Sequence, residues 1–167
     1  IVMLMAFVFV MIYYESLHAG WLMILPMLYA TILTYGYMGF MNIGISVNTI
    51  PVIAVGVGVG IDYAVYIMDR IREEYEELHD LREAVLRALS TTGLAVGFTA
   101  ATLIAGVIMW VILSDLRFQS DAALLLTVML ALNAVAAVLL VPAWVMAFKP
   151  KFITGIHRDE DGILQND

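Results

Sequence analysis

The sequence contains no cysteine among its 167 residues, which excludes disulfides, thiol catalysis and cysteine-ligated metal sites. Charge is also scarce, because Asp, Glu, Lys and Arg make up only 14% of the residues while 63% are hydrophobic. The 8 Lys and Arg residues form no basic stripe, so nothing indicates nucleic-acid binding. Soluble domains of this size carry far more charge. The composition therefore predicts an integral membrane protein.

Five apolar segments are separated by short polar links, and a helix needs about 20 residues to cross a bilayer. We predict an all-α membrane protein: a transmembrane bundle over residues 1–148, followed by a polar cytoplasmic tail over 149–167. The predicted spans are 1–14, 21–41, 50–69, 90–113 and 121–148. The first would rise only about 21 Å and has no signal-peptide features. We therefore expect a truncated first helix, with the chain beginning inside a longer protein.

The segment 70–89 is charged but keeps apolar residues at helical spacing, which predicts an amphipathic helix at the membrane surface. Asp80 and Glu83 have the spacing of a capping box. We therefore expect a break near His79 and a new helix from Leu81.

The distribution of Lys and Arg predicts the orientation of the bundle. With five spans, segment 70–89 and the tail lie on one side of the membrane and contain every Lys and Arg except Arg117. Cytoplasmic loops are enriched in Lys and Arg. This side, with the C-terminus, is therefore predicted to be cytoplasmic.

Small residues recur every four positions on two of the predicted spans. The third span carries Gly56 and Gly60, with Gly58 between them, and the fourth carries Gly93 and Gly97. Such stripes let helix backbones approach closely in lipid. We predict that these glycines lie at helix–helix contacts, and that the two stripes could face each other. The alternative is that glycine is simply frequent in membrane helices.

Asp62 is the one carboxylate in the middle of a predicted span, about 18 Å from its start. An ionised carboxylate at that depth costs several kcal/mol unless it is paired, hydrated or protonated. Such acids usually face a bundle interior and mark proton paths. We predict that Asp62 carries protons. The alternative is a permanently hydrogen-bonded acid that joins two helices.

Hydroxyl groups near the same depth are candidate partners in a proton relay. Tyr63 and Tyr66 lie beside Asp62 on the same span, while Thr99 lies on the fourth span. Gly58, four residues before the acid, leaves room beside it. Threonine in a membrane helix often bonds only its own backbone, so Thr99 is the weaker candidate.

Three further polar residues are less informative. Thr102 and Asn133 are additional candidate partners of Asp62, and Asp69 is expected to be a solvated residue at the membrane interface. The three histidines lie in links and tail without forming a ligand cluster. We therefore expect no metal and no cofactor, with a proton as the coupling ion.

Several segments resemble one family of transporters. They are IPVIAVGVGVGIDYAVYIMDRIREEY (50–75), with its GxxxDY core, EAVLRALSTTG (83–93) and VPAWVMAFKPKF (141–152). This pattern resembles half of a transporter of the RND superfamily, specifically its MMPL or predicted-exporter branch, which is related to sterol-sensing domains. The ending resembles that of the C-terminal half.

The resemblance implies a non-enzymatic, proton-driven exporter of hydrophobic or lipid-like substrates in a bacterial inner membrane. It also implies that Asp62 and Tyr63 form an Asp–Tyr relay with a matching pair in an N-terminal half. Expected partners are that half, periplasmic domains and membrane lipids, and a homo-oligomer is left open. Two alternatives remain: a lipid-sensing module of sterol-sensing type without proton transport, and an RND relative that assists protein translocation.

Overall fold

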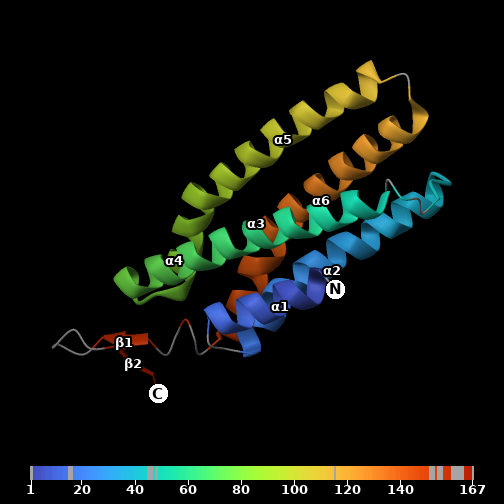
Figure 1. Ribbon diagram of the computed structural model, residues 1–167. Coiled ribbons are helices and arrows are strands. Elements are labelled where there is room, and N and C mark those ends of the chain that lie inside the picture. Colours follow the sequence, from blue (N-terminus) through green and yellow to red (C-terminus); the bar gives the residue numbers. More distant parts are fainter. Residues whose placement is uncertain are drawn as a thin grey trace.

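The computed structural model describes residues 2–14, 17–44, 47, 49–114, 116–150, 153, 156–158 and 164–166. Figure 1 shows a bundle of long helices whose axes are roughly aligned. The helices are α1 (Val2–Tyr13), α2 (Leu17–Phe40), α3 (Thr49–Leu78), α4 (Leu81–Ala88), the π-helix η1 (Leu89–Gly93), α5 (Leu94–Leu113) and α6 (Arg117–Phe148). The predicted all-α membrane bundle is confirmed.

Four stretches of helix are long and apolar enough to cross a membrane: Gly20–Phe40, Thr49–Leu78, Leu81–Leu113 and Gln119–Phe148. The first apolar helix, α1, is shorter. It packs against α2 and α3 and so belongs to the bundle. Whether it crosses the membrane stays a prediction.

Helix α6 lies at the centre of the bundle, where it contacts α2, α3 and α5. The sequence explains this position, because buried residues recur at every fourth position along α6. They are Leu125, Met129, Asn133, Ala137, Val141 and Val145, each no more than 2% exposed. Residues four apart lie on one face of a helix. This face of α6 is therefore the surface against which its neighbours pack.

The amphipathic segment is divided between two helices. Helix α3 continues past the predicted end of its span to Leu78, because its buried face extends through Ile71 and Glu74. His79 then adopts a left-handed backbone with φ of 55°. The Asp80 side chain caps α4 by accepting hydrogen bonds from the backbone N–H groups of Arg82 and Glu83. The predicted break at His79 and restart at Leu81 are confirmed.

Helices α4 and α5 are joined through η1 without a break. The Ser90 and Thr91 hydroxyls donate to the Arg87 carbonyl at 2.9 and 3.0 Å in this region. Short π-helical turns within α-helices frequently occur at functional sites. Here η1 contributes Thr92 to the cavity described below.

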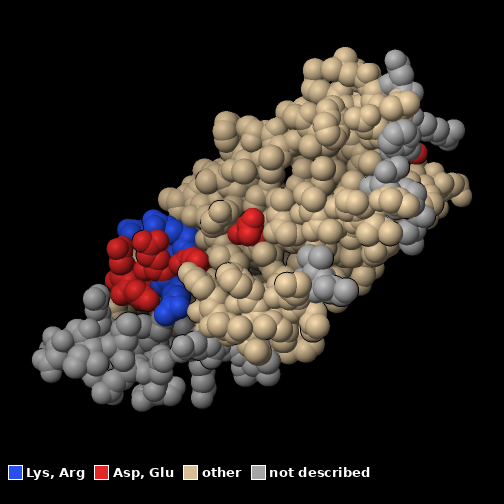
Figure 2. All heavy atoms as spheres, in the orientation of Figure 1, with Lys and Arg blue, Asp and Glu red and all other residues tan. Residues whose placement is uncertain are grey.

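The ends of the bundle differ in character. In Figure 1, α4 and the two C-terminal strands lie at one end, while the end of α2 and the junction of α5 with α6 lie at the other. The strands β1 (Ile156–Arg158) and β2 (Leu164–Asn166) pair antiparallel, with Ile156 opposite Asn166. The prediction of a polar tail over 149–167 did not include these strands. Figure 2 shows acidic and basic side chains gathered at the α4 end, with little charge elsewhere among the described residues of this face.

Candidate functional site

Asp62 lies on the exposed side of α3. Val55, Gly58, Asp62 and Tyr66 are all exposed and lie three or four residues apart, so they share one face of the helix. No hydrogen bond or ion pair joins Asp62 to any residue within the described ranges. The expectation that Asp62 points into the interior of this bundle is therefore wrong for this chain. Its side chain faces the surface because the opposite side of α3 packs against α6.

Tyr63, the next residue, has the opposite environment. Its side chain is only 3% exposed, and its hydroxyl has no hydrogen-bond partner among the described residues. A buried polar group without a partner costs about 1–3 kcal/mol. The Tyr63 hydroxyl is thus poised to bind a water molecule or another polar group.

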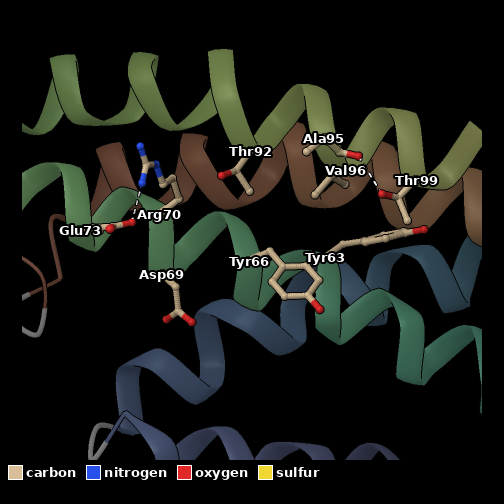
Figure 3. Close-up of a pocket in the computed structure, with 9 residues that line it drawn as sticks. All are labelled: Tyr63, Tyr66, Asp69, Arg70, Glu73, Thr92, Ala95, Val96 and Thr99. Atoms are coloured by element: carbon tan, nitrogen blue, oxygen red, sulfur yellow. Dashed lines mark hydrogen bonds and ion pairs between the residues drawn. The ribbon is translucent and has the colours of Figure 1, made fainter.

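A cavity of about 470 Å³ lies between α3 and the helix formed by η1 and α5. On the α3 side it is lined by Tyr63, Tyr66, Asp69, Arg70 and Glu73. Figure 3 shows that Tyr63 extends towards α5, whereas Asp69 points to the opposite side of α3. Asp62 is not among the lining residues. The structure therefore brings Tyr63 and Tyr66 together at the cavity and leaves Asp62 outside it.

The opposite wall of the cavity is lined by Thr92, Ala95, Val96 and Thr99. Of these, Thr92 and Thr99 supply hydroxyl groups, and both side chains point towards α3 in Figure 3. Thr99 donates its hydroxyl proton to the Ala95 carbonyl at 2.9 Å. Its hydroxyl proton is therefore not directed at Asp62, but its oxygen can still accept a hydrogen bond from a molecule in the cavity.

Asp69 is not the solvated interface residue that the sequence analysis expected. It is half-buried, and the Tyr14 hydroxyl donates a hydrogen bond to its Oδ1. Tyr14 follows α1 and is itself only 6% exposed. This bond joins residues 55 positions apart and fixes the end of α1 to α3. The role of Tyr14 could not be predicted from the sequence, since no local pattern relates the two positions.

A second polar residue was missed on α3. Glu74 is only 4% exposed, and it forms ion pairs with Arg70 at 2.6 Å and with Arg87 of α4 at 3.5 Å. Arg70 also bonds Glu73 at 2.6 Å. The signal was present in the sequence, because Glu74 follows Ile67 and Ile71 at helical spacing and so falls on the buried face.

The other candidate partners of Asp62 bond elsewhere. Thr102 donates to the Thr99 carbonyl at 2.8 Å, within its own helix. Asn133 is 2% exposed and donates through Nδ2 to the Gly56 carbonyl at 2.9 Å. Asn133 is therefore a connection between α6 and α3 rather than a partner of the acid.

The glycines divide into two groups. A Cβ on Gly56 would overlap Met129, and one on Gly60 would lie 2.6 Å from Cγ of Asn133, so both glycines meet α6 closely. A Cβ on Gly93 would meet only Leu89 of the adjacent turn, at 3.3 Å. No described atom lies within 4 Å of the same position at Gly58 or Gly97. The α3 stripe thus packs against α6, and the two glycine stripes do not face each other.

These features define a multi-pass helical membrane protein with a cavity beside its third helix that both apolar and polar side chains line. No group of three or more His, Asp or Glu among the described residues has the geometry to hold a metal ion. The chain belongs to the MMPL family, whose family model matches residues 1–156. The resemblance of the GxxxDY segment to the MMPL branch is confirmed by this match.

Named relatives match shorter parts of the chain. The trehalose monomycolate exporter MmpL3 of Mycobacterium tuberculosis is 33% identical over 95 residues, which cover 53% of this chain and 10% of that protein. The mycolic acid-containing lipids exporter MmpL11 of Mycolicibacterium smegmatis is 42% identical over 52 residues, covering 31% of this chain and 6% of that protein.

The protein named "putative membrane protein MJ1562" of Methanocaldococcus jannaschii is 32% identical over 99 residues, which cover 59% of this chain and 26% of that protein. The chain thus spans about a quarter or less of the length of these curated relatives. No solved structure matches it.

Proposed function

We propose that this chain is the transmembrane part of the C-terminal half of a proton-driven exporter of hydrophobic or lipid-like substrates in a bacterial inner membrane. Membership of the MMPL family supports this proposal. So do the names of two relatives, which are exporters of trehalose monomycolate and of mycolic acid-containing lipids. These names favour transport over lipid sensing or assistance to protein translocation.

The observation that carries the proposal is the contrast between Asp62 and Tyr63. The acid is exposed in an apolar span without a partner among the described residues, while the adjacent hydroxyl is buried and unpaired. A carboxylate that faced hydrocarbon would cost several kcal/mol. The face of α3 that carries Asp62 is therefore covered by polar groups or water in the complete protein, as an N-terminal half with its own Asp–Tyr pair would provide.

In this mechanism Asp62 takes up a proton on the covered face, and Tyr63 passes it towards the cavity. Protonation neutralises Asp62 and so weakens the interaction of this face of α3 with the polar groups that cover it. This difference in interaction free energy shifts α3 between two positions in the bundle. Because Gly56 and Gly60 pack directly against α6 and Asn133 bonds the Gly56 carbonyl, α6 moves with α3. Periplasmic domains elsewhere in the protein use this movement for export.

Replacement of the acid tests the proposal in the full-length protein. Asp62→Asn should abolish transport of a fluorescent glycolipid in proteoliposomes with an imposed proton gradient, since asparagine keeps the shape but exchanges no proton. Expression and folding should be retained, because the change removes a charge from the middle of a membrane span. Tyr63→Phe should slow transport less completely.

Asp121→Asn, which makes the same chemical change at the start of α6, is the matched control and should transport normally. Gradient-dependent transport by the Asp62→Asn variant at the native rate would show that Asp62 is not the proton carrier.

A further inference from the structure

Glu74 is a buried carboxylate at the place where α3 meets α4. Its side chain is only 5% exposed, and each of its two oxygens faces an arginine. Oε1 lies 2.6 Å from Arg70 of α3, whereas Oε2 lies 3.5 Å from Arg87 of α4. Among the described residues, the other ion pairs join residues three or four apart on α3. The Glu74–Arg87 contact is therefore the one ion pair of the described chain that connects two helices.

The two sides of this charge cluster differ in geometry. Arg70 lies 2.6 Å from both Glu73 and Glu74, within its own helix. The 3.5 Å distance from Glu74 to Arg87 is too long for a direct charge-assisted hydrogen bond, which measures about 2.7–2.9 Å. Oε2 of Glu74 is buried and has no hydrogen-bond partner among the described residues. Because an unsatisfied buried charge is costly, a closer approach of Arg87 would lower the free energy of this carboxylate.

Helix α4 is built to make such an approach. Its fully buried residues, Ala84, Val85 and Ala88, are small, so they bury little apolar area and hold α4 weakly. The helix packs far more extensively against α3 than against α6. The left-handed His79 lies just before α4, and the π-helix η1 follows it directly. Both are irregular points of the backbone, and α4 can pivot between them.

A pivot of α4 would change the cavity between α3 and α5. Helices α4, η1 and α5 form one continuous helical stretch, so they move together. Thr92 of η1 lies in one wall of the cavity. Arg70 and Glu73 lie in the α3 wall at the same end (Figure 3). An approach of Arg87 to Glu74 would therefore bring the η1 wall towards α3 and narrow the cavity at this end.

We propose that the Glu74–Arg87 contact is a latch between α3 and α4 with two positions. The structure shows the open position, and in the closed position Arg87 donates a hydrogen bond directly to Oε2 of Glu74. The desolvation cost of a buried ion pair offsets much of its Coulomb attraction, so a small difference in free energy selects one position. The latch rests on the proposed function only in that export would use this movement, and it does not require Asp62 to carry the proton.

Distances between spin labels on α3 and α5 test the latch. This chain contains no cysteine, so Glu77→Cys on α3 and Leu94→Cys at the start of α5 give unique labelling sites once any cysteines elsewhere in the full-length protein are replaced. Both side chains are exposed and lie outside the cavity wall. Double electron–electron resonance in lipid nanodiscs should show two distance components, of which the shorter belongs to the closed position.

Arg87→Ala removes the latch but leaves Glu74 its ion pair with Arg70, and the shorter component should disappear. The fold should be retained, because Arg87 is 53% exposed and alanine favours helix. Arg87→Lys keeps the positive charge and should keep the shorter component. Arg82→Ala is the matched control, since it makes the same change on α4 at an arginine that has no ion pair among the described residues. It should leave both components unchanged.

An Arg87→Ala variant with the distance distribution of the unchanged protein would overturn the latch, as would a single component in the unchanged protein. These distances are measured without transport. A lost shorter component in Arg87→Ala together with normal transport by Asp62→Asn would support the latch and remove the proposed proton carrier. An unaltered distribution in Arg87→Ala together with a transport-deficient Asp62→Asn would overturn the latch alone.

Discussion

At the scale of single residues, Asp62 and Tyr63 are adjacent in sequence but lie in different environments, one exposed and the other buried. Successive residues of an α-helix point in directions about 100° apart. Asp62 is consequently exposed on the outer face of α3, while Tyr63 is buried and lines the cavity. An adjacent acid and hydroxyl can therefore join the outer face of α3 to the cavity between α3 and α5.

Tyr14→Phe tests the connection between α1 and α3. The change removes only the hydroxyl that donates to Asp69 and leaves a half-buried carboxylate without this donor. We expect a loss of about 1–3 kcal/mol in stability, because hydrogen bonds to charged groups contribute this much. Thermal unfolding in detergent measures the change. Tyr13→Phe is the control, since Tyr13 is 59% exposed, and equal stability of the two variants would contradict the prediction.

At the scale of helices, the contact between α3 and α6 should depend on glycine at position 60. Gly60→Ala places a Cβ against the amide of Asn133, which must then move and weaken its bond to the Gly56 carbonyl. We expect a lower unfolding temperature in detergent. Gly97→Ala should be neutral or slightly stabilising, because alanine favours helix by about 1 kcal/mol and meets no described atom.

A Gly97→Ala variant that is as unstable as Gly60→Ala would show that the exposed stripe of α5 packs against another part of the full protein. A stable Gly60→Ala variant would show that the α3–α6 contact tolerates an added methyl group.

The boundaries of the helices could be predicted from the sequence more completely than the contacts between helices. Apolar run length and the Asp80 cap act locally, so the long helices and the break at His79 follow from composition and spacing. Which face of α3 meets which helix depends on distant residues. Neither the Asn133–Gly56 bond nor the Tyr14–Asp69 bond has a local signature. The burial of Glu74, by contrast, could be predicted from the sequence, because Glu74 continues the apolar stripe of Ile67 and Ile71.

At the scale of the whole molecule, the distribution of charge gives the bundle two distinct ends. The ion pairs of Arg70, Arg72 and Arg87 with nearby glutamates lie on α3 and α4. The C-terminal strands lie at the same end of the bundle (Figure 1). Since Lys and Arg are enriched on the cytoplasmic side of membrane proteins, this end is the one we expect to face the cytoplasm.

Labelling of single cysteines tests this orientation in intact cells. Helices α5 and α6 each cross once in the predicted topology, so Glu77→Cys and Gln165→Cys should lie in the cytoplasm and Gln119→Cys on the opposite side. A membrane-impermeant maleimide should therefore label Gln119→Cys in intact spheroplasts, and should label the other two only after the membrane is opened. Glu77 and Gln119 lie near opposite ends of the α4–η1–α5 unit, a 33-residue helix that contains an apolar segment long enough to span a bilayer. Labelling of Gln119→Cys and Gln165→Cys from the same side would mean that α6 does not cross, and the predicted topology would be wrong.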